Sequence, residues 1–431
     1  MPEIIAILSF CAVLVACIAC GISIIPALLA GVAIFLIHGR LTGHAFKPMV
    51  AKGLATMRAA SIVVVTFVLI GMLTTLWRAA GTVPFIVANT TGLVRPHVVI
   101  LLTFLLNCLM SLLAGSSFAS AATMGVITMT LGTSMNISPM LLGGATLSGI
   151  YFGDRCSPVS TSAQLVKTLT HTNIFDNIRL MLRTATVPFA LSCAIYAAMA
   201  LCTHPSAGSV DITALFSKAF DLHWVTVVPA VVLVILAVAR IDVRATMGAS
   251  ALSALPICLF VQHMDWPEIG RALLFGFHCA DPRVAPLVDG GGIGSMVKVM
   301  LIVCISSSYS GIFQETGLLR GAHRLISSLA RHVSVFGATL AASIATGAIA
   351  CNQTLSIMLT DQLCEHLESD GQRKAINLED TAVVVAPLVP WSIASGVPLA
   401  SVGAPTSSLL MAVFLYLLPL TRLIDAAVRR K

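Results

Sequence analysis

The stretch GIYFGDRCSPVSTSA, residues 149–163, interrupts a largely apolar chain with charge, proline and hydroxyl groups. An apolar helical pattern stops at Gly153, and Pro158 removes a backbone donor and hinders the hydrogen bond one turn back. Irregular backbone at membrane depth is tolerated where it lines a cavity. The stretch therefore predicts a broken helix at an ion or substrate site. The alternative is that Asp154 and Arg155 form an ordinary ion pair where a helix meets the cytoplasm.

The composition around this stretch is that of a protein embedded in lipid. Of 431 residues, 57% are hydrophobic and only 10% are charged, and the mean hydropathy is +0.96. A soluble domain carries about 25% charged residues. Many apolar runs approach the ~20 residues that cross a bilayer, and they lack the alternation of barrel strands. We expect an all-α polytopic membrane protein with about 10–14 helical elements, some of them broken or re-entrant.

Loop charges orient the chain in the membrane. Basic residues gather in short loops, whereas the loop at 263–268 is acidic. The positive-inside rule then predicts a multi-pass protein of the cell (inner) membrane with both termini cytoplasmic. This bias also explains the net charge of +7 without a nucleic-acid partner. The basic segments are 40–58, 155–183, 240–244, 320–331 and 429–431.

Two membrane halves, 1–203 and 223–431, are joined by a mixed segment at 204–222. A helix closes at 77–81 in the first half and at 313–317 in the second, each before another apolar span. The two closing loops fall on opposite sides of the membrane in the predicted topology. Opposite sidedness of matching parts is typical of two inverted-topology repeats in secondary transporters. The alternative is chance similarity between two hydrophobic halves.

A second broken region lies in the second half, at PLVPWSIASGVP (387–398) and 401–408. Three prolines and Gly396 within 387–398 exclude a straight helix. Paired broken helices in corresponding places are the best sequence indication of a transport site. The alternative is a kinked helix with small residues at a packing interface.

Two polar stripes share helical faces: Ser116, Ser120 and Thr123 at i, i+4, i+7 in one, and Gln353, Ser356 and Thr360 at i, i+3, i+7 in the other. Packing and ligand binding explain the first stripe equally well. Ligand binding is favoured for the second, because amides, including that of Asn352 just before it, cost more to bury. Asp361 and Glu315 are candidate functional acids, unless they lie in water at helix ends.

Several blocks of this chain resemble the NhaC-type sodium/proton antiporter family. The most specific is SGIYFGD (148–154) running into SPVS (157–160). The others are 70–84, 173–181, 291–317 and 387–406. The resemblance implies an inverted-repeat transporter fold with the ion site between broken helices. It also shows departures, because an acid of the better-known members is Thr161 here, another is Asn352, and an asparagine is Ser392.

Two functions follow. The first is a secondary antiporter that exchanges sodium, or another monovalent cation, for protons, with Asp154 as the titrating cation ligand. The second is a sodium- or proton-coupled transporter or exchanger of a small organic acid or amino acid, which the missing acids make more credible. The candidate ion- or substrate-binding residues are Asp154, Ser157, Ser160, Thr161, Ser162, Asn352, Gln353 and Ser392, with Ser116, Ser120, Thr123 and Asp361 as secondary candidates.

An enzyme is not expected. The chain has neither a His-Glu-x-x-His motif nor a Gly-x-Ser-x-Gly elbow. Its 12 cysteines and 11 histidines are dispersed and lack metal-ligand spacing, so we expect no cofactor and no structural metal. The partners are the lipid bilayer and the transported species, and the sequence is compatible with a homodimer.

Overall fold

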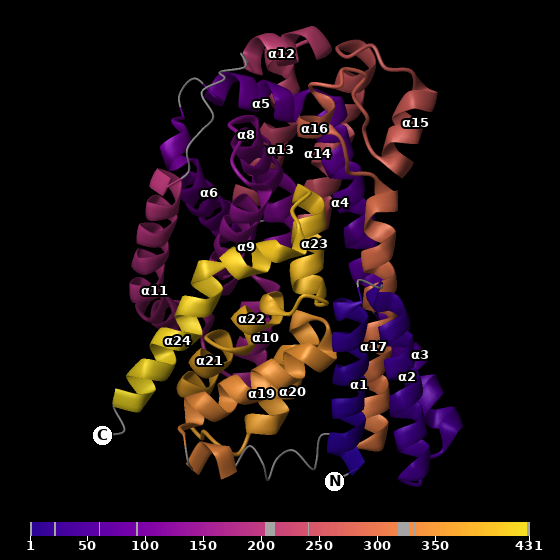
Figure 1. Ribbon diagram of the computed structural model, residues 1–431, viewed down its shortest axis with the longest axis vertical. Helices are drawn as coiled ribbons and strands as arrows, with labels where there is room; N and C mark the ends of the chain where they lie inside the picture. Colours follow the sequence, from indigo (N-terminus) through magenta and orange to yellow (C-terminus); the bar gives the residue numbers. More distant parts are fainter. Residues whose placement is uncertain are drawn as a thin grey trace.

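The computed structural model describes residues 2–20, 23–59, 61–91, 94–202, 212–239, 241–317, 328–331 and 333–428. Helices dominate these residues, and both ends of the chain lie at the bottom of the molecule in Figure 1. Residues 204–211 of the predicted linking segment 204–222 lie outside the described residues, and α12 (Ile212–Ala219) occupies most of the rest. Of the basic loop residues, Arg240, Arg320, Arg324 and 429–431 are also outside them.

Within the described residues, five helices are long and apolar enough to cross a membrane, and three bent pairs raise the number of candidate spans to eight. The prediction of an all-helical multi-pass membrane protein is confirmed. Breaks divide the expected 10–14 elements into shorter segments. The long helices are α2 (Ile24–Leu41), α6 (Val99–Ala114, with η1, Pro96–Val98), α11 (Ile174–Cys202), α14 (Val243–Phe260) and α17 (Ile293–Thr316).

The bent pairs join α4 (Ser61–Ala79) to α5 (Thr82–Thr91) at 59°, α12 to α13 (Val228–Val238) at 97°, and the segment of α21 (Gly371–Glu379) to α23 (Ile393–Val402) at 56°. The remaining elements used below are α1 (Pro2–Ala19), α3 (Phe46–Ala59), α10 (Thr161–Thr170), α15 (Trp266–Phe275), α16 (Ala285–Val288), α22 (Ala382–Val385) and α24 (Val413–Val428).

Two helices of equal length break in the same way. After α6, Gly115 adopts φ 61° and Ser116 is extended, with its hydroxyl capping α7 (Ser117–Ser120). After α19 (Val335–Ala350), Cys351 adopts φ 56° and Asn352 is extended, with its side chain capping α20 (Gln353–Cys364). A left-handed residue ends a helix, and a following cap starts the next one in a new direction. α7 then continues through a π-helix, a form frequent at functional sites, into α8 (Val126–Ser134).

α9 (Pro139–Cys156) contains residues 149–156, the first part of the stretch GIYFGDRCSPVSTSA, and packs directly on the backbone of α6. A Cβ atom at Gly149 would lie 2.6 Å from the Phe104 carbonyl oxygen, and one at Gly153 would lie 2.6 Å from the Leu112 backbone nitrogen. Glycines four residues apart allow such close approach of membrane helices. This contact fixes the end of α9, and therefore Asp154, against α6.

We expect Gly149→Ala to lower the stability of the folded protein by about 1–3 kcal/mol, because the methyl group forces α6 and α9 apart. Thermal unfolding in detergent, followed by the loss of monodisperse protein, measures the effect. Gly270→Ala on α15 is the matched control, since nothing lies within 4 Å of its Cβ position. Equal unfolding temperatures for the two variants would contradict the close packing.

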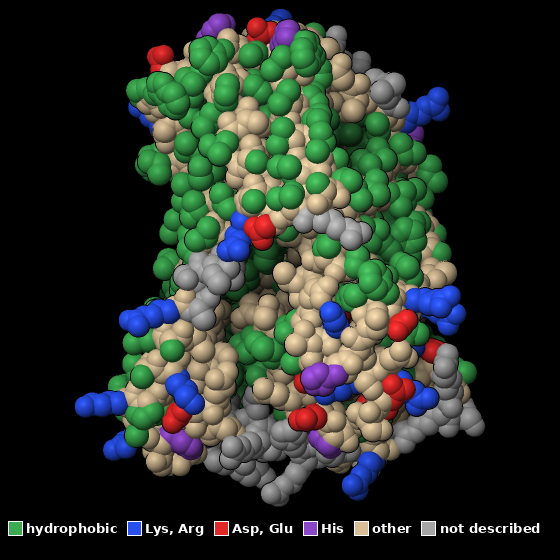
Figure 2. Space-filling model, turned by 180° about the vertical axis from the view of Figure 1, so that it is seen from behind, with side chains coloured by type: hydrophobic (Ala, Val, Ile, Leu, Met, Phe, Trp, Pro, Cys, Tyr) green, Lys and Arg blue, Asp and Glu red, His purple; other side chains and the backbone are tan. Residues whose placement is uncertain are grey.

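The surface agrees with a membrane protein whose basic side holds both termini. Figure 2 shows hydrophobic side chains over most of the upper part of one face, whereas most of the visible Lys and Arg side chains gather in its lower part. Large apolar side chains on α11 and α13, such as Val187 and Ile235, are exposed, which lipid would cover.

Candidate functional site

A cavity of about 320 Å³ lies beside Asp154. It is enclosed by segments far apart in the sequence, from α3, α7, α9, α10, α17, α20 and α23. Among the described residues that line it, Asp154 is the one acid. The polar side chains of its wall are Thr56, Ser116, Ser117, Asp154, Thr161, Ser307, Ser310, Asn352, Gln353 and Thr354.

Four helices begin at the wall of this cavity. Backbone N–H groups in a first helical turn lack helical partners, and the helix dipole places about +0.5 charge there. The structure therefore concentrates positive potential on one small volume. The first residues of the helices, all in the wall, are Ser117 of α7, Thr161 of α10, Gln353 of α20 and Ile393 of α23, and their caps are Ser116, Ser160, Asn352 and Ser392.

Asp154 is held by neutral donors. Ser160 Oγ donates to Asp154 Oδ1 at 3.0 Å, and Ser162 Oγ donates to Oδ2 at 3.1 Å. The backbone N–H of Ser117 and the side chain of Gln353 also interact with the carboxylate. Its side chain is only 3% exposed. The carboxylate, on α9, thus lies against the starts of α7, α10 and α20. The described residues of the cavity wall include no Lys or Arg.

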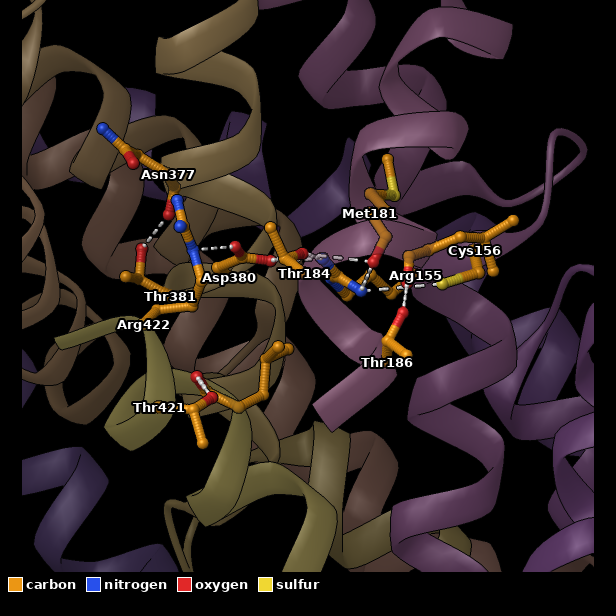
Figure 3. Close-up of polar contacts among 12 residues, drawn as sticks. Arg155, Cys156, Met181, Thr184, Thr186, Asn377, Asp380, Thr381, Thr421 and Arg422 are labelled. Carbon is orange, nitrogen blue, oxygen red and sulfur yellow. Dashed lines mark hydrogen bonds and ion pairs between the residues drawn. The ribbon is translucent and has the colours of Figure 1, made fainter. Parts of the chain in front are cut away.

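Asp154 and Arg155 do not form an ion pair with each other. Consecutive residues on a helix point about 100° apart, so Arg155 faces the other way, toward α11. Its guanidinium pairs with Asp380 and donates to the Thr184 hydroxyl at 2.7 Å and to the Met181 carbonyl at 3.0 Å (Figure 3). Both members of the Arg155–Asp380 pair are fully buried. The alternative drawn from the sequence, an ordinary Asp154–Arg155 pair where a helix meets the cytoplasm, is therefore wrong.

Asp380 is the centre of a buried ion network. Its second oxygen accepts a hydrogen bond from Arg422 Nε at 2.8 Å, and the Thr184 hydroxyl donates to the first at 3.2 Å. Arg422 also pairs with Asp425 at 3.3 Å. As Figure 3 shows, the network joins α9 and α11 on one side to the segment after α21 and to α24 on the other.

The structure brings together many of the residues predicted for the site. Asp154, Thr161, Asn352, Gln353 and Ser116 line the cavity, and Ser160 and Ser162 bind the Asp154 carboxylate. Ser157 instead donates to the Leu112 carbonyl at 2.8 Å, which ties α9 to α6. Ser392 caps α23, and its neighbour Ile393 rather than its own side chain is in the wall.

The remaining candidates lie outside the cavity wall. Ser120 donates to the Ser116 carbonyl, and Thr123 borders a separate apolar cavity of about 280 Å³. Asp361 pairs with Lys374 at 2.8 Å, and Glu315 pairs with Lys52 at 2.9 Å.

The second stripe does not face the cavity as a whole. Ser356 and Thr360 interact with Thr346 of α19, at 3.3 and 2.7 Å, and therefore pack α20 against α19. Only the first member of that stripe, Gln353, reaches the cavity.

The sequence analysis missed the contribution of α3 and α17. Thr56 of α3 and Ser307 and Ser310 of α17 also line the cavity. The sequence signal for the two serines was the run SSSYS at 306–310 within an apolar span. The adjacent acids Glu379 and Asp380, which are both fully buried, were also not predicted from the sequence to have a role.

Comparison with known proteins gives one family. A model of the Na+/H+ antiporter family matches residues 149–424. The Na(+)/H(+) antiporter NhaC of Alkalihalophilus pseudofirmus is 27% identical over 366 residues, covering 81% of this chain and 78% of the relative. The arginine/ornithine antiporter ArcD of Halobacterium salinarum is 28% identical over 79% of this chain and 73% of its own length. The malate-2H(+)/Na(+)-lactate antiporter of Bacillus subtilis is 24% identical over 83% and 79%.

Proposed function

The chain belongs to the Na+/H+ antiporter family, and we propose that it exchanges a small carboxylate or amino acid for sodium ions or protons. It is a multi-pass secondary transporter rather than an enzyme. The observation that carries the proposal is the cavity of about 320 Å³ in which four helix starts face the single carboxylate of Asp154. The solute binds there, between the two sets of broken helices.

The size of the cavity supports an organic solute. A water molecule needs roughly 10–15 Å³ of cavity volume, and the volumes of small-molecule pockets begin near 300 Å³. A partly dehydrated sodium ion with its ligands would fill a small part of about 320 Å³. A solute of several heavy atoms, accompanied by water, fits the volume better.

The charge distribution supports a carboxylate group on that solute. The four helix starts together outweigh one ionised carboxylate, at about +0.5 charge each. A solute carboxylate binds at the free N–H groups of these first turns, as expected for broken helices of transporters. Asp154 then binds the opposite charge, which is the ammonium of an amino acid or the coupling cation. Thr161, Asn352 and Gln353 supply hydrogen bonds to the rest of the solute.

The relatives support the same class of solute. Two of them are described as antiporters of organic solutes, one of arginine and ornithine and one of malate and lactate. Both cover most of this chain at identities comparable with that of the Na(+)/H(+) antiporter NhaC. The level of sequence identity is therefore as compatible with transport of an organic solute as with transport of a bare cation.

Exchange of sodium for protons is the second candidate, favoured by the immediate surroundings of Asp154. One carboxylate with two hydroxyls, from Ser160 and Ser162, forms a cluster of hard oxygen ligands. In this case Asp154 alternates between a bound proton and a bound cation, and the rest of the cavity holds water.

We further propose an inverted repeat relating the halves 1–203 and 223–431 across the segment 204–222. The matching breaks after α6 and α19 support it. So do the helices α4 and α17, each followed by a left-handed glycine, Gly81 or Gly317. In Figure 1, α4 leads up to α5 whereas α17 runs down from the region of α16. With the basic side facing the cytoplasm, both termini are cytoplasmic and the cavity lies between the repeats.

Counterflow in proteoliposomes tests the proposal. Vesicles are loaded with one unlabelled solute from a panel of amino acids, hydroxy acids and dicarboxylates, and uptake of the same labelled solute is followed. We expect at least one solute to be taken up about 10-fold faster than by empty liposomes. Vesicles containing Asp154→Asn are the control. Sodium pulses that collapse a pH gradient, with no counterflow of any solute, would overturn the proposal in favour of sodium/proton exchange.

A further inference from the structure

Glu379 is a buried acid that the proposed solute site does not use. It is the last residue of α21, its side chain is fully buried, and it is absent from the wall of the solute cavity. Neither of its carboxyl oxygens has a hydrogen-bond partner among the residues that the structure describes. A carboxylate buried without a partner is strongly unfavourable, whereas the neutral acid is tolerated. This environment therefore favours the neutral, protonated form of Glu379.

The charges around Glu379 explain why no nearby arginine serves as its counter-ion. The groups that interact with it are Asp154, Arg155 and Cys156 on α9 and Asp380 beside it. Arg155 already pairs with Asp380, which also binds Arg422 of α24, and Arg422 pairs with Asp425. These two arginines and two aspartates balance one another. An ionised Glu379 would add an uncompensated negative charge.

Arg155 retains one donor that suits an ionised Glu379. Its Nε–H has no acceptor among the described residues, although its terminal nitrogens donate to Asp380, Thr184 and Met181. Thus an unsatisfied donor and an unsatisfied acid interact within the same buried network. A side-chain rearrangement that brings these two groups together would give the Glu379 carboxylate a charged partner.

We propose that Glu379 is the proton-binding residue of the transport cycle, separate from the solute cavity but electrostatically coupled to Asp154. While Asp154 is ionised and free, its charge disfavours a second negative charge at Glu379, which keeps its proton. When a sodium ion or an ammonium group neutralises Asp154, the Glu379 O–H bond breaks, the proton passes to water, and the carboxylate turns to Arg155. Cation binding and proton release are thereby linked, which is the requirement for antiport. This inference rests on the proposed transport through the cavity of Asp154.

The variant Glu379→Gln separates proton coupling from solute binding, because glutamine has nearly the same shape but cannot release a proton. In proteoliposomes we expect counterflow of the transported solute to stay within about twofold of the unmodified protein. We expect uptake driven by a pH gradient, and proton movement reported by an internal pH-sensitive dye, to fall at least 10-fold. Retention of gradient-driven uptake at the unmodified rate would overturn the proposal, as would an equal loss of counterflow and driven uptake.

Two additions keep the outcomes distinguishable. If Glu379→Gln is not recovered in the membrane, Glu379→Asp is used: it keeps an acid, and it should shift the pH dependence of driven uptake while preserving counterflow. An unchanged pH dependence would overturn the role of Glu379. If no organic solute gives counterflow, the proposed solute has failed, and Glu379 is tested through sodium. Its variant should then retain exchange of labelled for unlabelled sodium and lose the proton movement that a sodium pulse drives.

Discussion

Replacing Asp154 with asparagine will reduce coupled transport at least 10-fold while leaving the protein folded. Asparagine fits the same space and can still hydrogen-bond the hydroxyls of Ser160 and Ser162, which now hold the carboxylate at 3.0 and 3.1 Å. It loses the charge that binds an ammonium group or a cation, and charge-assisted hydrogen bonds contribute about 1.5–3 kcal/mol, or roughly 10- to 150-fold. Initial rates in proteoliposomes of matched protein content measure the loss.

The control for Asp154 is another acid on an apolar helix, Glu315 of α17. Its side chain is 27% exposed and pairs with Lys52, which is 53% exposed. Exposed ion pairs contribute about 0–1 kcal/mol, so Glu315→Gln should transport within about twofold of the unmodified protein. Full activity of Asp154→Asn, or an equal loss in both variants, would show that the site lies elsewhere.

Replacing Asp380 with alanine will destabilise the protein by about 3–5 kcal/mol, because it leaves the buried guanidinium of Arg155 without its counter-ion. Arg422, which is 21% exposed, also loses a partner but keeps Asp425. The network joins α9 and α11 to α24, so these helices should separate first on heating. Thermal unfolding in detergent, with the yield of monodisperse protein as a second readout, measures the change.

Asp370 gives the matched control on the same segment. It caps the start of α21 by accepting the backbone N–H of Gln372 at 2.9 Å, and its side chain is 52% exposed. Loss of a helix cap costs about 1 kcal/mol, so Asp370→Ala should unfold at a clearly higher temperature than Asp380→Ala. If both variants unfold together, the buried network does not hold the helices in place.

The sequence predicted the broken helices because their signals are local. α9 continues past Gly153, where the apolar pattern stops, and ends at Cys156 just before Pro158, and the cavity lies beside this break. The second broken region was predicted equally well from its prolines. In the structure the Tyr151 hydroxyl donates to the Ala394 carbonyl at 2.5 Å, which ties α9 directly to α23.

The predictions that did not hold depend on contacts between residues far apart in the chain. Arg155 finds its counter-ion 225 positions away, and nothing near it in the chain indicates Asp380. The stripe through Ser356 and Thr360 has the spacing of a ligand-binding face, but α19 covers that face. Hydroxyl groups are equally suited to solutes, helix caps and helix packing, so spacing alone cannot separate these uses.

The position of four helix starts in the cavity wall suggests how members of this family could differ in the solute that they transport. In the proposed site, much of the attraction for an anion comes from peptide groups at the starts of α7, α10, α20 and α23, and exchange of the neighbouring side chains leaves these peptide dipoles in place. Evolution can therefore exchange the handful of side chains that decorate these ends, such as Thr161 and Asn352, and redirect the transporter without rebuilding its scaffold. The same division gives protein engineers a fixed electrostatic frame with a small, editable recognition layer.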